Sequence, residues 1–115
     1  MDSFSVVVGR VVTADELVSF LRGSGGYVND EATGSGGVAH GEANVYIDLQ
    51  VPAHPLGMRA DALSSELVFS PSRREGSVEL AFKVADEAVT QWGGVIDWSG
   101  LDWLEDMYRQ RAEGG

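Results

Sequence analysis

The sequence contains no cysteine. Disulfide bonds, thiolate metal sites and cysteine nucleophiles are therefore excluded, and the absence suits the reducing cytoplasm. The sequence also lacks any apolar run near the roughly 20 residues that a membrane-spanning helix needs. The N-terminal MDSFSVVVGRV has no basic segment followed by a long apolar run. We therefore expect a cytoplasmic protein with no signal peptide and no membrane contact.

Basic residues are few, since 8 Lys and Arg stand against 18 Asp and Glu, and the net charge is −10. Nucleic acid and anionic membrane surfaces would repel such a chain, whereas a basic protein would attract it. The same acidity is also typical of small proteins that need it only for solubility. Charge alone therefore leaves both interpretations open, and it argues against a nucleic-acid partner.

No pattern in the sequence predicts catalysis, a metal or a cofactor. His40 and Glu42 form an H-x-E pair, with His54 further along, but no H-x-x-x-H or cysteine pair completes a zinc site. The glycines of Gly34–Gly37 lack the P-loop lysine and dinucleotide spacing, so they predict a flexible hairpin tip. A G-x-S-x-G nucleophile elbow is also missing. We therefore do not expect an enzyme.

The composition suits a domain with one hydrophobic core, because 43% of the 115 residues are hydrophobic. Strands are predicted at Phe4–Val12, from Tyr27, at Asn44–Val51, at Glu66–Phe69 and at Val95–Trp98. Helices are predicted after Thr13, after Ser77 and from Asp102. Turns are expected at Pro52–Leu56, with a helical turn at Arg59–Ser64. This order predicts a single α+β domain over residues 1–115, with a mostly antiparallel sheet of about four to five strands, two main helices and a short C-terminal helix.

The stretch from Ser77 to Gly93 admits two interpretations. Apolar residues recur at alternating steps of four and three, on one helical face: Val78, Phe82, Ala85, Val89 and Trp92. The first half also alternates in the manner of a strand. The alanines, a serine placed to cap the start and Gly93 placed to end the segment favour a helix. Glu79 and Glu87 each stand four residues from Lys83 and are expected to pair with it.

Two groups of residues are candidates for binding a partner. Strict alternation over Asn44–Val51 places Tyr46 and Asp48 on the solvent face of an antiparallel strand, where they form a contact patch or ordinary surface. Trp98 and Trp103 lie among acidic residues, as a hot spot for a basic protein would require, or they close the end of the sheet. The candidate partner-binding residues are Tyr46, Asp48, Asp97, Trp98, Asp102, Trp103, Glu105 and Asp106.

The run SPSRREGSVELAFKVADEAVTQWGGVIDWSG at Ser70–Gly100 resembles the C-terminal part of small bacterial immunity proteins. These are encoded beside polymorphic or contact-dependent growth-inhibition toxins, and they share a strand, a polar turn, a helix ending in Trp-Gly and a short strand with aspartate. GEANVYIDL at Gly41–Leu49 resembles their central strand. The resemblance covers about half of the chain. It implies a cytoplasmic protein that occludes one cognate toxin, often a basic nuclease, without catalysis or cofactor, and it implies no particular site residue.

Two other functions are alternatives. A small enzyme or ligand-binding domain would use a pocket between the sheet and the helices, with His40, Glu42 or Tyr46 in it. A structural subunit of a phage or secretion assembly would instead form higher-order complexes. For the immunity function we expect a monomer or a weak dimer.

Overall fold

A computed structural model of the protein describes residues 3–50 and 65–113. Six strands and three helices lie within these ranges. They are β1 (Phe4–Val8), α1 (Ala14–Gly23), β2 (Tyr27–Asp30), β3 (Ser35–His40), β4 (Ala43–Gln50), β5 (Ser65–Pro71), α2 (Ser77–Trp92), β6 (Val95–Asp97) and α3 (Asp102–Glu113). The predicted α+β fold is confirmed, with a short C-terminal helix and one strand more than expected. The predictions for Val51, Pro52–Leu56, His54 and Arg59–Ser64 lie outside the described residues.

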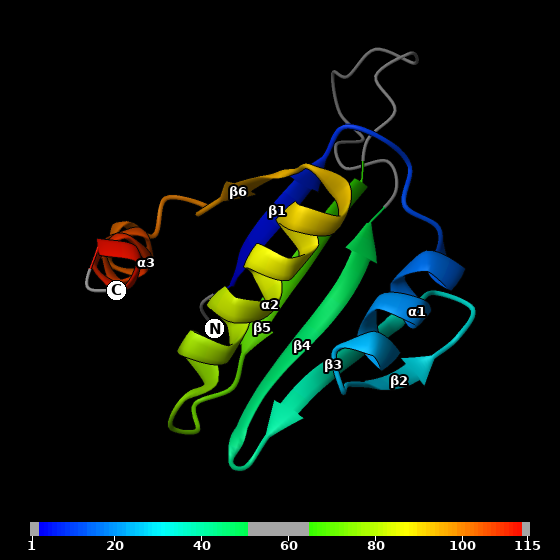
Figure 1. Ribbon diagram of the computed structural model, residues 1–115, viewed down its shortest axis with the longest axis horizontal. Helices are drawn as coiled ribbons and strands as arrows, with labels where there is room; N and C mark the ends of the chain where they lie inside the picture. Colours follow the sequence, from blue (N-terminus) through cyan, green and yellow to red (C-terminus); the bar gives the residue numbers. More distant parts are fainter. Residues whose placement is uncertain (1–2, 51–64, 114–115) are drawn as a thin grey trace.

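The strands form one sheet in the order β2-β3-β4-β5-β1-β6, and every neighbouring pair is antiparallel. Helices α1 and α2 lie on the same face of this sheet, with α1 over β2 and β3 and α2 over the central strands (Figure 1). Helix α3 lies beyond α2, on the β6 side (Figure 1). Within residues 3–50 and 65–113, no helix covers the opposite face.

The core lies between the sheet and α2. Strand register places Phe4 of β1 beside Phe69 of β5, and Phe69 beside Ile47 of β4. All three side chains are fully buried, because period-two alternation turns them to the helical face. The Phe4 and Phe69 rings are stacked at 5.4 Å, and the Phe82 ring of α2 lies 6.0 Å from Phe4. This aromatic cluster fixes α2 against the middle of the sheet.

Helix α1 begins with the predicted capping box. The Thr13 hydroxyl accepts a hydrogen bond from the Glu16 amide at 3.1 Å, and the Glu16 carboxylate accepts one from the Thr13 amide at 3.1 Å. Leu17 and Leu21 are fully buried against β3. The helix ends at Gly23, as predicted.

The Glu16 carboxylate also forms an ion pair with the Arg10 guanidinium, in which Arg10 Nη2 lies 2.6 Å from Glu16 Oε2. The hydrogen bonds from Arg10 and Thr13 lower the Glu16 pKa to about 2. Because folding lowers this pKa, the stabilisation is complete above the ordinary pKa of 4.5 and is lost as the pH falls toward 2. The pair is exposed, so solvent screening keeps its contribution to the free energy of unfolding small.

Glu16→Gln is therefore expected to lower the free energy of unfolding at pH 7 by less than about 1 kcal/mol, with the difference closing near pH 2. Urea denaturation at several pH values measures this, and Asp15→Asn, an adjacent exposed carboxylate, is the control. A Glu16→Gln deficit that stays constant down to pH 2 would show that charge is not its cause.

The segment from Ser77 to Gly93, which the sequence left open between helix and strand, forms the helix α2. Gly93 ends this helix with φ 74°, as predicted. The predicted serine cap is wrong, because Gly76 occupies the N-cap position and Ser77 is the first helical residue. The buried Ser77 hydroxyl instead accepts from the Asn44 amide at 3.0 Å and bonds the Ser72 hydroxyl at 2.7 Å. The expected ion pairs of Lys83 with Glu79 and Glu87 are not formed among the described residues.

The prediction of a hairpin tip at Gly34–Gly37 is largely wrong. Only Gly34 lies in the turn, while Ser35, Gly36 and Gly37 begin β3, the strand missing from the prediction. A Cβ atom at Gly36 would meet the Tyr27 carbonyl oxygen and would lie 2.9 Å from Leu21 Cδ1. Glycine here allows α1 to approach the sheet, a role that glycines within strands often have.

Gly36→Ala is expected to lower the free energy of unfolding by about 1–3 kcal/mol, because backbone or Leu21 must move to admit the methyl group. The matched control is Gly23→Ala, since nothing lies within 4 Å of the added Cβ there. Urea denaturation of both variants checks this, and equal stabilities would contradict the close approach of α1.

Candidate protein-binding surfaces

The sheet face opposite α1 and α2 carries two tyrosines. Strand pairing places Tyr27, Gly37, Tyr46 and Ser70 in one row across β2 to β5, with side chains directed away from the helices. The Tyr27 hydroxyl donates to Asn44 Oδ1 at 2.9 Å, and burial is the main cause that raises the Tyr27 pKa. Tyr46 is 49% exposed, so its predicted position on the solvent face is confirmed.

Every charged residue that the structure describes on this face is acidic. Asp30 pairs with Ser35, Asp48 lies across from Val68, Glu66 pairs with Gln50 and Val7, and Asp97 pairs with Ser5. We call this surface the open face, and its described outward residues are Ser5, Val7, Tyr27, Asp30, Ser35, Ala39, Asn44, Tyr46, Asp48, Gln50, Glu66, Val68, Ser70, Val95 and Asp97. None of them is Lys or Arg. The open face therefore carries a negative potential at its centre and at the β6 edge.

Two exposed acidic side chains of the open face, Asp48 and Asp97, are held in place by hydrogen bonds. Asp48 Oδ1 accepts from the Ser35 hydroxyl at 2.7 Å, and Asp97 Oδ1 accepts from the Ser99 amide at 2.9 Å. A carboxylate with a fixed position loses less side-chain entropy when a cation binds it. Each of these carboxylates has one oxygen held by a neighbouring group of the same chain.

Trp98 and Trp103 have different environments. Trp98 is half-buried, with its ring 5.1 Å from Phe4 and 5.1 Å from Tyr108, so it closes the end of the core. Trp103 is 46% exposed on α3, beside Arg73, Arg74 and Met107 in a groove of about 560 Å³. Sequence neighbours of a helical residue point in other directions, so the acidic residues around Trp103 do not line this groove with it.

The two arginines in this groove differ from the other described arginines. Each of the others pairs with a carboxylate at 2.6–3.0 Å: Arg10 with Glu16, Arg22 with Glu31, Arg109 with Glu105 and Arg111 with Asp86. Arg73 and Arg74 make no ion pair with any described residue. Sequence spacing could not place them beside Trp103, because the contact joins the turn before α2 to α3.

The eight candidate residues therefore lie in three places. Tyr46, Asp48 and Asp97 lie on the open face. Asp102, Trp103, Glu105 and Asp106 lie on α3, where Glu105 is already paired with Arg109 at 2.6 Å. Trp98 packs inward. A partner-binding role for these residues stays a prediction, and the structure joins only the first three with a wider acidic surface.

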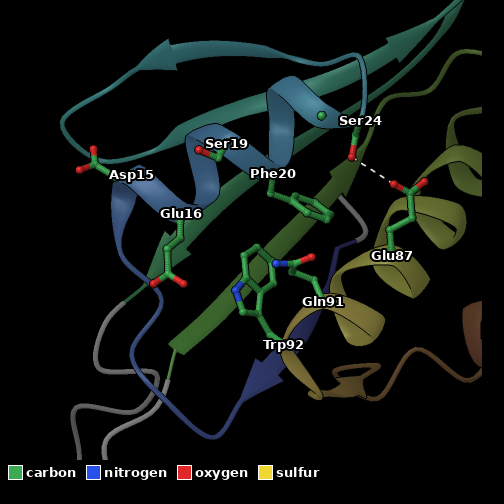
Figure 2. Close-up of a pocket in the computed structure, with 9 residues that line it drawn as sticks. Asp15, Glu16, Ser19, Phe20, Ser24, Glu87, Gln91 and Trp92 are labelled. Atoms are coloured by element: carbon green, nitrogen blue, oxygen red, sulfur yellow. Dashed lines mark hydrogen bonds between the residues drawn. The ribbon is translucent and has the colours of Figure 1, made fainter.

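A cavity of about 570 Å³ opens between α1 and α2 on the helical face (Figure 2). Phe20 of α1 and Trp92 of α2 meet in it, with ring centroids 4.9 Å apart and planes inclined at 47°. Glu87 of α2 extends toward α1, where its Oε2 accepts from the Ser24 hydroxyl at 3.1 Å (Figure 2). The sequence alone does not predict this cavity, because its residues come from two helices far apart in the chain.

Trp92 ends the predicted apolar face of α2, and it is half-buried in the wall of this cavity. Its Nε1 is buried and has no hydrogen-bond partner among the described residues. An unpaired buried donor costs about 1–3 kcal/mol. Packing against Phe20 therefore fixes the position of the indole at the expense of a hydrogen bond.

A third cavity, of about 470 Å³, lies between the β3–β4 turn and α2, and it contains His40, Glu42 and Lys83. Tyr46 lies on the opposite sheet face, so the three residues proposed for a ligand pocket do not meet. Within the described ranges, no three His, Cys, Asp or Glu residues gather as a metal site would require. None of the helices described there is long and apolar enough to cross a membrane.

No protein-family model matches the chain, and no curated protein or solved structure matches it.

Proposed function

We propose that this protein binds a basic protein partner through the open face and blocks it, in the manner of an immunity protein that neutralises a cognate toxin. The observation that supports this proposal is the open face itself. No described helix covers it, and its described outward charges are all negative: Asp30, Asp48, Glu66 and Asp97. A basic surface is the electrostatic complement of this face.

The tyrosines provide the anchoring contacts. Tyr46 lies on β4 near the middle of the open face, and Tyr27 lies on the edge strand β2. The half-buried Val68 and the exposed Val95 lie toward the β6 edge. Tyrosine contributes a large apolar area and a hydroxyl while losing little conformational entropy. The carboxylates around it attract the partner and orient the encounter, which mainly raises the association rate. This division of roles is typical of a specific interface.

Occlusion of a toxin requires neither catalysis nor a cofactor. The partner in this role is a basic toxin domain, for example a nuclease, which meets the protein in the cytoplasm. The net charge of −10 extends the attraction beyond the open face to the whole molecule. A monomer or a weak dimer suffices for one-to-one binding.

Calorimetric titration with the protein encoded by the neighbouring gene tests the proposal. Tight binding that weakens as salt rises is the expected result, since salt screens the attraction between an acidic face and a basic partner. The control titrant is an unrelated domain of similar size and basic charge, which separates specific recognition from general charge attraction. Absence of binding to the neighbouring protein at low salt, or equal binding to both titrants, would contradict the proposed function.

A further inference from the structure

We propose that the cavity between α1 and α2 binds an alkylguanidinium cation, the group carried by arginine. The proposal concerns the helical face and does not depend on the open face, which lies on the other side of the sheet (Figure 1). It rests on an aromatic floor, on the Glu87 carboxylate directed across the opening, and on a described lining that contains no lysine or arginine.

The aromatic floor consists of Phe20 and Trp92. Both side chains are half-buried and line a cavity of about 570 Å³. Their inclination of 47° leaves them forming a corner rather than a flat stack. A planar guanidinium stacks on an indole or phenyl ring and is attracted by its π electrons, and tryptophan is the best such platform. The floor distinguishes this cavity from a mere cluster of acidic residues.

The walls supply acceptors for the donors of a guanidinium. Glu87 and Gln91 stand one helical turn apart on α2, and Figure 2 shows both beside the aromatic pair. Ser24 holds one oxygen of Glu87, Oε2, which leaves Oε1 with no side-chain hydrogen bond among the described residues. Glu16 bounds the cavity on the α1 side, although its charge is balanced by Arg10. A guanidinium on the floor would therefore meet fixed acceptors.

Among the described residues, no lysine or arginine lines this cavity. Most described arginines lie within 3.0 Å of a carboxylate, yet Glu87 has no such partner within residues 3–50 and 65–113. Asp15 adds a further negative charge at the rim, although its side chain points away from the aromatic pair (Figure 2). Lys83 and Arg111 lie on the other side of Glu87, in a neighbouring depression that Glu87 also lines, and Arg111 is paired there with Asp86. The negative charge on the cavity side is therefore open to a cation from outside the chain.

The probe is N-acetyl-L-arginine amide, titrated into the isotope-labelled protein and observed by NMR. The chain has three tryptophans, so Trp98 and Trp103 serve as internal references for the indole N–H resonance of Trp92. The expected result is a saturable shift of the Trp92 resonance alone. N-acetyl-L-citrulline amide has nearly the same shape without the charge, and it is expected to leave that resonance in place.

The variant Glu87→Gln keeps an acceptor for Ser24 but removes the charge, and it is expected to weaken binding of the probe about fivefold. The matched control is Glu79→Gln, two turns earlier on α2 and outside this cavity, with unchanged binding expected. No saturable shift of Trp92, or an equal shift with the citrulline probe, would overturn the proposal. So would equal effects of the two variants.

Free L-arginine separates the two sources of the cation. Free L-arginine carries an α-ammonium and an α-carboxylate, which the blocked probe lacks. Binding no tighter than that of the blocked probe means that the site does not recognise these groups, and it indicates an arginine within a protein. Tighter binding of free L-arginine indicates a small molecule. Both results retain the cation site, and neither requires the toxin partner, so this proposal can fail without the proposed function failing.

Discussion

Phe4→Ala is expected to lower the free energy of unfolding by about 3–5 kcal/mol, a large share of the roughly 5–15 kcal/mol that stabilises a typical domain. Phe4 is fully buried and contacts the rings of Phe69, Phe82 and Trp98 at 5.1–6.0 Å. Its removal leaves a cavity where the sheet, α2 and the segment before α3 meet. Urea denaturation followed by tryptophan fluorescence measures the loss.

The control for this prediction is Val7→Ala on the same strand. Val7 is directed to the open face and is only half-buried, so its truncation is expected to change stability by less than about 1 kcal/mol. A similar loss for both variants would show that the aromatic cluster does not organise the core.

The double variant Asp48→Lys with Asp97→Lys is expected to weaken binding of the basic partner at least about tenfold at low salt, mainly through a slower association rate. Both residues lie on the open face, and the substitutions change the net charge from −10 to −6, because each adds two positive units. Surface plasmon resonance resolves the association and dissociation rates. Thermal melting checks that loss of the hydrogen bonds from Ser35 and Ser99 has not unfolded the protein.

The matched control is Asp102→Lys with Asp106→Lys on α3, which gives the same net charge of −6. It keeps the open face intact while altering the other half of the candidate residue set. We expect a smaller loss of affinity for this variant. An equal loss would mean that net charge alone attracts the partner, and a larger loss would place the interface on α3.

Local signals made the helices predictable from sequence. The capping box at Thr13 and Glu16 and the left-handed Gly93 both act within a few residues, and the structure has both. The strand β4 was predictable because its apolar and polar residues alternate, which indicates a strand with one buried face and one face toward solvent. Strand β3 was not, because Gly36 and Gly37 carry no side chain that could alternate. Their requirement for close packing becomes visible only when α1 lies on the sheet.

The candidate surfaces were harder to predict, because each combines residues from distant segments. Alternation correctly placed Tyr46 on the solvent face, yet it could not show that Glu66 and Asp97 share that face. Sequence proximity grouped Trp98 with Trp103, whereas one packs into the core and the other lies beside two arginines. Contacts between elements, rather than neighbours in the chain, define each surface.

The most direct test of the open face as a docking surface is NMR chemical-shift mapping of the protein bound to its basic partner. We predict that the largest changes fall on Tyr46, Asp48, Val95 and Asp97, with small changes in α1 and α2. Changes confined to the helices, with the outward residues of β4 and β6 unaffected, would contradict the account.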